Sequence, residues 1–268
     1  MQATITKKLP TFLFALIAVA TPLSAQLDSV VVVNAATSQT GFPVAPGSWA
    51  TAFGDFGSFG VVNNLLATEA GPVPPFPTTL NGVQVFVDGS QAPMNFVGPT
   101  QINFIIPGGT STSPPNRAAL RIVVGGAEVY SGEINVWPIS PGLFGGFTGD
   151  GLFAAAALNQ DFTVNGPDNP AGRGSVVQLF GTGAQYSSLP ADGDIATGDP
   201  LIGTTLDPTA EISVVDAQVI FSGLAPGLAN VWQVNLTIPD RPAVLAGPVA
   251  VVIRLGGLAT NRAVIWVR

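Results

Sequence analysis

QINFIIP at residues 101–107 and QVNLTIP at residues 233–239 are two copies of one pattern. In the second copy every other residue is apolar, as in a β-strand that buries one face and exposes the other. Each copy ends on a proline, which cannot donate a hydrogen bond to a neighbouring strand and therefore stops the pairing. The pattern predicts equivalent strands in two halves of the chain.

Other motifs recur in the same order around these two strands. The matched stretches, first half and then second, are VVVVN (30–34) and AAALN (155–159), APGSWATAFG (45–54) and GRGSVVQLFG (172–181), GVQVFVDG (82–89) and EISVVD (211–216), and the hairpins 119–137 and 249–267. The alanine run alone is also compatible with a helix. Gly125-Gly126 and Gly256-Gly257 favour tight two-residue turns, because glycine adopts positive φ at little cost.

The composition agrees with a β-rich fold, since 32 Gly and 24 Pro separate short runs rich in Val, Ile, Phe and Thr. Short strands with frequent turn signals are typical of immunoglobulin-like sandwiches. We therefore predict an all-β protein of two tandem immunoglobulin-like β-sandwich domains, with a barrel or a jelly roll as the alternatives. The chain has no Cys, so each domain would depend on its apolar core instead of on disulfides.

Residues 1–26 have the features of a secretory signal peptide: Lys7 and Lys8 precede an apolar stretch, and small residues follow it. About a dozen apolar residues are too few to span a bilayer. We predict a signal peptide at 1–26, a first domain at 27–138, a linker at 139–153 and a second domain at 154–268. The mature protein is expected to be secreted, extracellular or at the cell surface, without a transmembrane segment.

Charged residues make up 9% of the chain, whereas roughly 25% is usual, and 47% of the chain is hydrophobic. Both lysines lie in the predicted signal. The remaining seven arginines and sixteen acidic residues give a net charge of 7 − 16 = −9. Such a surface repels nucleic acid and anionic lipids. We expect the partners to be further copies of this protein, other extracellular proteins or a glycan.

The residue types of most catalytic sites are missing from the sequence. Without His or Cys, and with both Lys in the predicted signal, Ser-His, Cys-His and Ser-Lys systems lack a base or a nucleophile. Zinc sites lack their usual ligands for the same reason. We predict a non-enzymatic protein with no catalytic residues and no cofactor apart from a candidate calcium ion. A pair of carboxylates that hydrolyses glycosidic bonds is the alternative.

The stretch DGDIATGD at residues 192–199 is the candidate calcium site. It gathers the carboxylates Asp192, Asp194 and Asp199, and calcium prefers oxygen ligands. The spacing is not that of an EF-hand loop, so a solvated turn is the alternative. The glycine-rich stretch GGFTGDG at residues 145–151 lacks the βαβ context of a phosphate-binding loop, and we interpret it as part of a flexible linker.

Aromatic side chains are the other candidates for binding. The four tryptophans lie in predicted strands, where core packing is the more frequent outcome: Trp49, Trp137, Trp232 and Trp266. The long loops 55–79 and 182–209 are better placed for recognition, because a rigid sandwich can present them. Their aromatic residues are the predicted binding residues: Phe56, Phe59, Phe76 and Tyr186.

Two sets of motifs resemble known families. Over residues 43–126 the order P-x-x-P-G-S, F-G, V-x-V-x-V-D-G-x-x-A-P, Q-I-N-x-x-x-P and G-G is similar to the IPT/TIG class of immunoglobulin-like domains. In the second half, AALNQD (156–161), LFGTG (179–183), FSGLAPG (221–227) and QVN (233–235) resemble an uncharacterised carboxy-terminal domain that is frequent in large secreted proteins of acidobacteria. The resemblance implies an exported module and supplies no catalytic residue.

These observations favour a structural or adhesive function for a secreted protein. Scarce charge weakens the usual protection of exposed strand edges against pairing. We therefore expect self-association into an extracellular filament, layer or matrix. The run at residues 30–33 is expected to pair within its own domain or to complete a neighbour's sheet. The alternative function is that of a module that binds a glycan or a cell-wall polymer.

Overall fold

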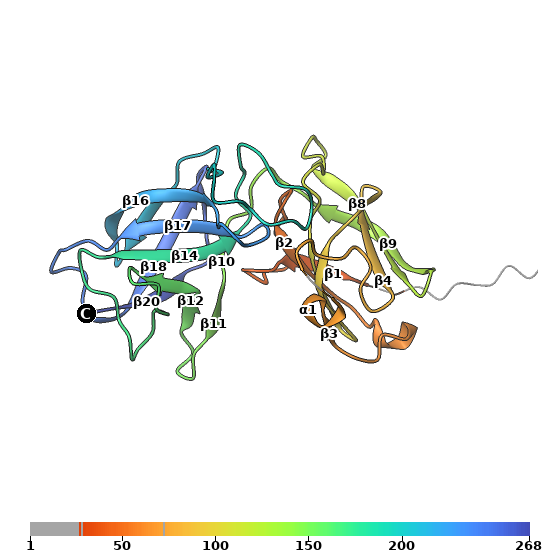
Figure 1. Cartoon of the computed structure of the whole chain (residues 1–268), viewed down its shortest axis with the longest axis horizontal. Coiled ribbons are helices and arrows are strands. Elements are labelled where there is room, and N and C mark those ends of the chain that lie inside the picture. The colour runs from red at the N-terminus through yellow and green to blue at the C-terminus, as the bar shows by residue number, and fades with distance from the viewer. Residues whose placement is uncertain (1–26, 28, 72) are drawn as a thin grey trace, which may run out of the picture.

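The computed structural model describes residues 27–268 apart from residues 28 and 72, so the predicted signal peptide at 1–26 lies outside the described residues. The described chain forms a first unit, β1 to β9, and a second unit, β10 to β20, which lie side by side in Figure 1. The helical segments are short, namely η1 (Gly57–Phe59) and α1 (Ala67–Ala70), and no described helix is long and apolar enough to cross a membrane. The prediction of an all-β fold is confirmed.

The first unit is a sandwich of two facing sheets. Its strands are β1 (Val31–Asn34), β2 (Trp49–Phe53), β3 (Leu65–Leu66), β4 (Val83–Val87), β5 (Ser90–Gln91), β6 (Met94–Gly98), β7 (Gln101–Ile105), β8 (Arg117–Val124) and β9 (Ala127–Asn135). One sheet has the order β1-β2-β7-β6-β3 and the other has the order β5-β4-β8-β9. These orders correspond to sheets A-B-E-D and C-F-G of an immunoglobulin-like sandwich, with β3 and β5 as added edge strands.

Alternation along the strands fills the space between the two sheets of the first unit. On β4, Val83, Val85 and Val87 are buried, and on β7 the residues Ile102 and Phe104 join the same apolar cluster. The polar residues of β7 point to the opposite face of its sheet, because successive side chains in a strand alternate. The run at 30–33 contributes to β1, which pairs with β2 of its own unit.

The second unit is also built from two layers. Its strands are β10 (Gly142–Leu143), β11 (Gly145–Phe147), β12 (Phe153–Ala155), β13 (Ala157–Asn159), β14 (Val176–Thr182), β15 (Thr209–Ile212), β16 (Val215–Leu224), β17 (Trp232–Thr237), β18 (Gly247–Leu255), β19 (Leu258–Ala259) and β20 (Ala263–Val267). Hydrogen-bonded neighbours follow the order β10-β14-β17-β16-β15-β18-β20-β12-β11, while β13 pairs with β14 and β19 with β18. The layers enclose an apolar cluster of their own.

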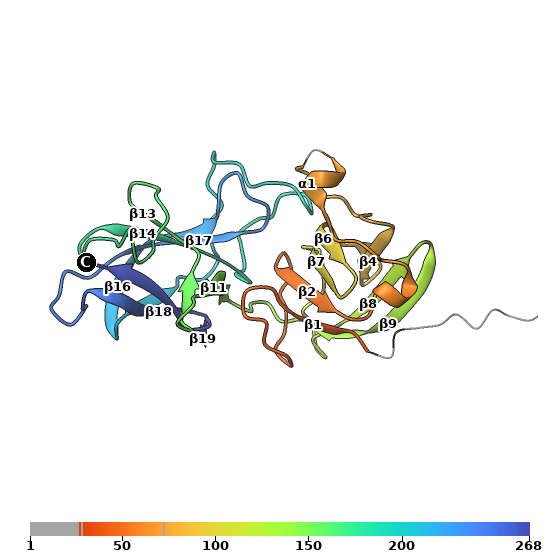
Figure 2. The same cartoon turned by 90° about the horizontal axis from the view of Figure 1, so that it is seen from below.

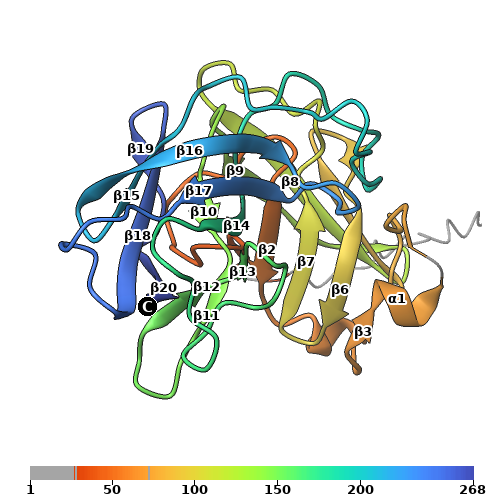
Figure 3. The same cartoon turned by 60° about the vertical axis from the view of Figure 1, so that its left-hand side comes forward.

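The strand β16 belongs to both layers of the second unit. Its first residues pair with β15, and the residues from Gln218 onward pair with β17, which lies beside it in Figure 3. In the first unit the equivalent stretch is divided into β5 and β6. Pro93 lies between them at the position that corresponds to Gln218, and proline has no N–H group with which to continue the ladder. One proline therefore separates the sheets of the first unit.

The two units repeat the same strand register as well as the same strand order. β7 lies between β2 and β6, and β17 lies between β14 and β16. Thr51 stands opposite Asn103 in the first unit, and Gln178 stands opposite Asn235 in the second. The closing hairpins turn at Gly125-Gly126 and at Gly256-Gly257, all with positive φ. The sequence repeat is therefore also a structural repeat.

Residues 139–153, where the sequence suggests a flexible linker, are instead part of the second unit's sheet. They hold β10, which pairs with β14, and β11, which pairs with β12. Glycine makes the second pairing possible, because a Cβ atom at Gly145 would collide with the carbonyl oxygen of Ala154. Gly145 thus reflects close approach of two strands, whereas a Cβ atom at Gly146, Gly149 or Gly151 would meet nothing within 4 Å.

Candidate functional site

The two units meet at Trp49, the first residue of β2. Its indole Nε1 donates a hydrogen bond of 2.9 Å to the carbonyl oxygen of Ala229, and its backbone N–H donates one of 2.9 Å to Thr182 Oγ1. The ring of Phe76 packs edge-on against the indole, with 5.4 Å between centroids and 87° between the planes. The side chain is 8% exposed. Trp49 is therefore buried between the units instead of inside one sandwich.

Further hydrogen bonds fix the same contact, which we call the joint and define by the buried residues Trp49, Ile105 and Ala229. Asn230 Nδ2 donates to the carbonyl oxygen of Gly47 at 3.0 Å. A loop of the second unit reaches across to the first unit in Figures 1 and 2. The backbone N–H of Phe76 donates a hydrogen bond of 2.8 Å to the carbonyl oxygen of Gly193. Each of these bonds involves a backbone group of the first unit, so they help to define how the two units are placed.

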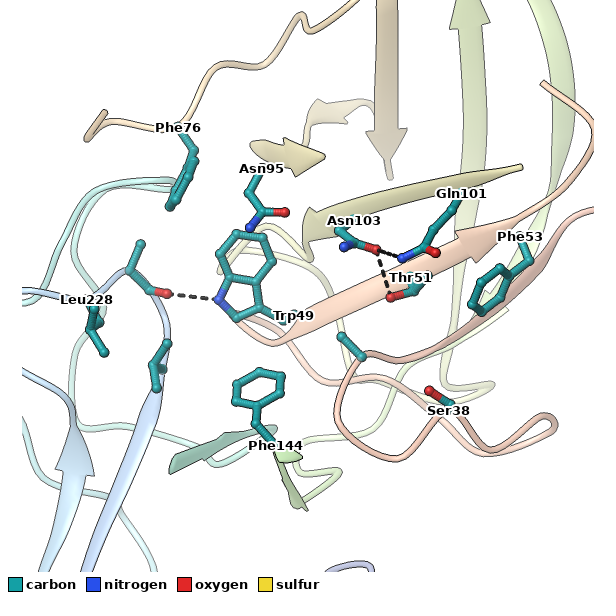
Figure 4. A pocket seen from close by; sticks show the side chains of 13 residues that line it. Ser38, Trp49, Thr51, Phe53, Phe76, Asn95, Gln101, Asn103, Phe144 and Leu228 are labelled. Atoms are coloured by element: carbon teal, nitrogen blue, oxygen red, sulfur yellow. Dashed lines mark hydrogen bonds between the residues drawn. The ribbon is translucent and has the colours of Figure 1, made fainter. Parts of the chain in front are cut away.

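A cleft of about 610 Å³ lies beside the joint, within the usual volume range of small-molecule sites (Figure 4). Strands β2, β6 and β7 supply one wall, and Phe144 and the segment before β17 supply the other. The residues that line it are Ala35, Ser38, Trp49, Thr51, Phe53, Phe76, Asn95, Gln101, Asn103, Phe144, Leu228, Ala229 and Val231. None of these described lining residues carries a charge. The cleft therefore combines aromatic rings with neutral amide and hydroxyl groups.

The polar side chains of the cleft form a connected group on the outer face of β2 and β7. Asn103 Oδ1 accepts a bond of 2.8 Å from Gln101 Nε2 and one of 3.1 Å from Thr51 Oγ1. Neither bond uses the two N–H donors of Asn103 Nδ2. Nearby, Asn95 Oδ1 is buried and has no hydrogen-bond partner within the described part of the chain. A buried acceptor without a partner costs about 1–3 kcal/mol, so Asn95 is a polar residue of the cleft that the described chain leaves unsatisfied.

In the second unit, β14 and β17 have an equivalent outer face, which lies outside the cleft. The matched pairs, second unit and then first, are Phe180 and Phe53, Gln233 and Gln101, and Asn235 and Asn103. Here too the glutamine donates to the asparagine, with 2.9 Å from Gln233 Nε2 to Asn235 Oδ1. None of the three residues of the second unit lines the cleft. The repeat therefore supplies an internal control for the contribution of these three side chains to the cleft.

The four aromatic residues predicted to bind from loops have different environments. Phe56 is fully buried in the core of the first unit, and Phe59 is half-buried against the same core; neither lines the cleft. Phe76 lines the cleft and contacts Trp49. Tyr186 is buried beside a separate pocket of about 260 Å³, and burial raises the pKa of its hydroxyl, which has no partner among the described residues. Phe76 alone of the four lies in the cleft.

The carboxylates of the candidate calcium site do not converge. Asp192 Oδ1 accepts a bond of 2.8 Å from the backbone N–H of Gly108 in the first unit, and Asp194 Oδ1 accepts one of 2.9 Å from Ile195. Asp199 is exposed. In the described chain no group of three or more His, Cys, Asp or Glu side chains is placed to hold a metal ion. Asp192 contributes instead to the contact between the units.

The remaining tryptophans show why strand position alone did not identify the cleft. Trp232 is fully buried in the second unit, Trp266 is 9% exposed, and Trp137 follows the end of β9 and is 45% exposed. The polar residues of the cleft, Gln101 and Asn103, belong to the motif that reveals the repeat. Their shared spacing in both copies indicated a solvent-facing strand face, but the sequence did not indicate that a second unit would close over one copy.

No protein-family model matches the sequence, and no curated protein is similar to it. Among solved structures, the chain is similar to the I9-I11 tandem from titin, with 10% sequence identity, a TM-score of 0.22, and coverage of 84% of this chain. The match spans 62% of that titin chain. A likeness at this level carries no argument about function, so the immunoglobulin-like assignment rests on the strand order. The resemblance to the acidobacterial domain stays a prediction.

Proposed function

We propose that the chain is an exported structural or adhesive protein that associates with itself, or with other extracellular proteins, through an exposed strand edge. The observation that carries this proposal is β11, which lies at the end of the strand order and pairs with β12. All residues of β11 are exposed, and Phe147 is 81% exposed. An exposed edge with apolar character is a template for another strand.

The contrast with β9, an end strand of the first unit, supports β11 as the associating edge. Glu128 and Glu133 of β9 face Arg121 and Arg117 at 3.9 and 3.2 Å, and the backbone N–H of Leu27 donates to the Val129 carbonyl oxygen. Charged side chains and a covering segment are common protections of an edge. β11 has the sequence Gly-Gly-Phe and carries neither a charge nor a proline.

Export and a structural role are further parts of this proposal. Export is supported by the signal-like features of residues 1–26 and by the resemblance to a domain of secreted acidobacterial proteins. A structural role is supported by the joint, since an assembly needs subunits whose edges keep a constant orientation. The absence of His and Cys from the sequence supports a non-catalytic role.

The test is sedimentation velocity and negative-stain electron microscopy of residues 27–268. We expect association that increases with protein concentration, and we expect Phe147→Lys to abolish it because a lysine on β11 opposes edge-to-edge pairing. Leu245→Lys is the matched control: it also replaces an exposed apolar residue, 67% exposed, but lies in a loop outside the sheets. A wild-type protein that stays monomeric up to its solubility limit, or equal effects of the two substitutions, would contradict the proposal.

A further inference from the structure

We infer that the cleft beside the joint binds an uncharged saccharide chain. A sugar ring presents apolar C–H faces and a rim of hydroxyl groups, so it is recognised by aromatic rings together with amide side chains. The cleft supplies both, with Phe53, Trp49 and Phe144 near Gln101, Asn103 and Asn95 (Figure 4). Aromatic packing and neutral hydrogen bonds are individually modest, so several must act together.

The backbone of the cleft wall favours a saccharide over a peptide strand. β2 pairs with β1 on one side and β7 on the other, and β7 pairs with β2 and β6. The N–H and C=O groups of these strands are thus engaged within the sheet, which leaves no edge for strand addition. Recognition at this wall must use side chains, and the amide groups of Gln101 and Asn103 each offer both donors and acceptors.

The charge of the site favours a neutral chain over an acidic one. The described lining residues are uncharged, and they offer no cation to pair with a uronate or a sulfate. Beyond residue 26 the sequence has seven arginines and sixteen acidic residues, so the field of the protein repels polyanions. An uncharged polymer needs no cation in the cleft and is not repelled by the negative charge of the protein.

The polar groups that the protein leaves without partners identify the contact points. Asn95 lines the cleft, and its Oδ1 is enclosed without a partner in the described chain, so a sugar hydroxyl can bond to this acceptor only if the amide turns toward the cleft. Asn103 Nδ2 can donate to a neighbouring hydroxyl, since both bonds to this side chain use Oδ1. Leu228 and Phe144 close the site from the second unit, so the ligand would touch both units.

The experiment is isothermal titration calorimetry of residues 27–268 with neutral hexasaccharides, namely those of cellulose, xylan, mannan, laminarin, amylose and chitin. We expect at least one to bind, while polygalacturonate and hyaluronan do not. Phe53→Ala and Gln101→Ala should each weaken binding by about fivefold or more, because each removes roughly 1 kcal/mol of contact. The matched controls are Phe180→Ala and Gln233→Ala, which make the same changes on the equivalent face of the second unit and should leave affinity unchanged.

Three results would overturn the inference: no neutral hexasaccharide binds at about 10 mM, a concentration that reveals even millimolar affinity; the second-unit variants weaken binding as much as the first-unit variants; or an acidic chain binds as tightly as a neutral one. The inference does not depend on self-association. Titrations repeated with the Phe147→Lys variant therefore test the cleft separately from the edge β11, and either proposal can fail while the other holds.

Discussion

The first residue of β2 and the first residue of β14 hold the same place in the two units but have different surroundings. Trp49 stands opposite Ile105, and both are buried, at 8% and 0% exposure, where the second unit covers them. Val176 stands opposite Thr237, and both are half-buried. The strand register is the same in the two units. The side chains at this pair of positions therefore differ according to whether a neighbouring unit covers them.

The largest expected loss of unfolding free energy is for the tryptophan that lies inside one unit, in contrast to Trp49 of the joint. Trp232 is fully buried, and its Nε1 donates to Ser222 Oγ at 3.0 Å. We expect Trp232→Ala to lower the unfolding free energy of the second unit by about 3–5 kcal/mol and to leave that of the first unit nearly unchanged. Urea unfolding followed by amide NMR signals of each unit measures both. Equal destabilisation of the two units would show that they do not fold independently.

A second prediction concerns the glycine where the second unit's β14 sheet meets the joint. Gly183 has a φ of 84°, and a Cβ atom there would collide with the carbonyl oxygen of Ser140. We expect Gly183→Ala to lower the unfolding free energy by about 2–3 kcal/mol, since backbone strain adds to a steric clash. Gly227 also has a positive φ of 79° but no atom within 4 Å, so Gly227→Ala should cost about 1 kcal/mol. Thermal unfolding of the two variants measures this difference. Equal losses of stability for Gly183→Ala and Gly227→Ala would show that the contact with Ser140 does not matter.

Trp49→Ala is expected to loosen the joint while both sandwiches stay folded. The substitution removes one hydrogen bond to Ala229 and the contact with Phe76, together about 1–2 kcal/mol, and also the apolar area that the indole buries between the units. Small-angle X-ray scattering should show a larger radius of gyration, and ¹⁵N relaxation should show faster tumbling of each unit. Val176→Ala, the change at the equivalent position, is the control and should alter neither measurement. A rigid Trp49→Ala protein would show that other bonds suffice to hold the joint.

The smallest expected change in unfolding free energy comes from replacing Thr237 of the second unit with isoleucine, the residue at the equivalent position of the first unit. Thr237→Ile copies Ile105, but in the described chain the Val176–Thr237 pair is only half-buried, so no neighbour fully buries the ethyl group that replaces the hydroxyl. We expect the unfolding free energy to change by less than about 0.5 kcal/mol. The reverse change, Ile105→Thr, places a hydroxyl at a fully buried position and should cost about 1–3 kcal/mol. Similar changes in unfolding free energy for the two variants would contradict the view that only the first unit buries the residue at this position.

Much of the fold follows from the sequence because its signals are local. The alternation at 101–107 and 233–239 predicts β7 and β17, and the double glycines predict the closing hairpins. Glycine misled the interpretation at 139–153. A glycine-rich stretch is compatible with a flexible backbone and also with a strand whose neighbour lies too close for a side chain. The sequence does not distinguish these two cases before the neighbouring strand is known.

The candidate site was less predictable because it depends on contacts between distant residues. Phe56 lies three residues after the end of β2 and is buried in the core, although it belongs to a stretch that the sequence suggests is an exposed loop. Asp192 lies in an acidic cluster of the sequence but bonds to Gly108, in the other unit. The cleft arises where Phe144 and Leu228 approach the face of β2 and β7, and no local pattern records that approach.

The unbroken strand β16 has a consequence for how the second unit opens to solvent. β16 forms hydrogen bonds with β15 in one layer and with β17 in the other. The two layers of this unit therefore cannot separate unless β16 loses its hydrogen bonds to one of these strands. Amide protons on both layers should then exchange with deuterium at one common slow rate. In the first unit, where Pro93 divides the equivalent stretch, the short strand β5 can detach alone, and its amides should exchange long before those of β4.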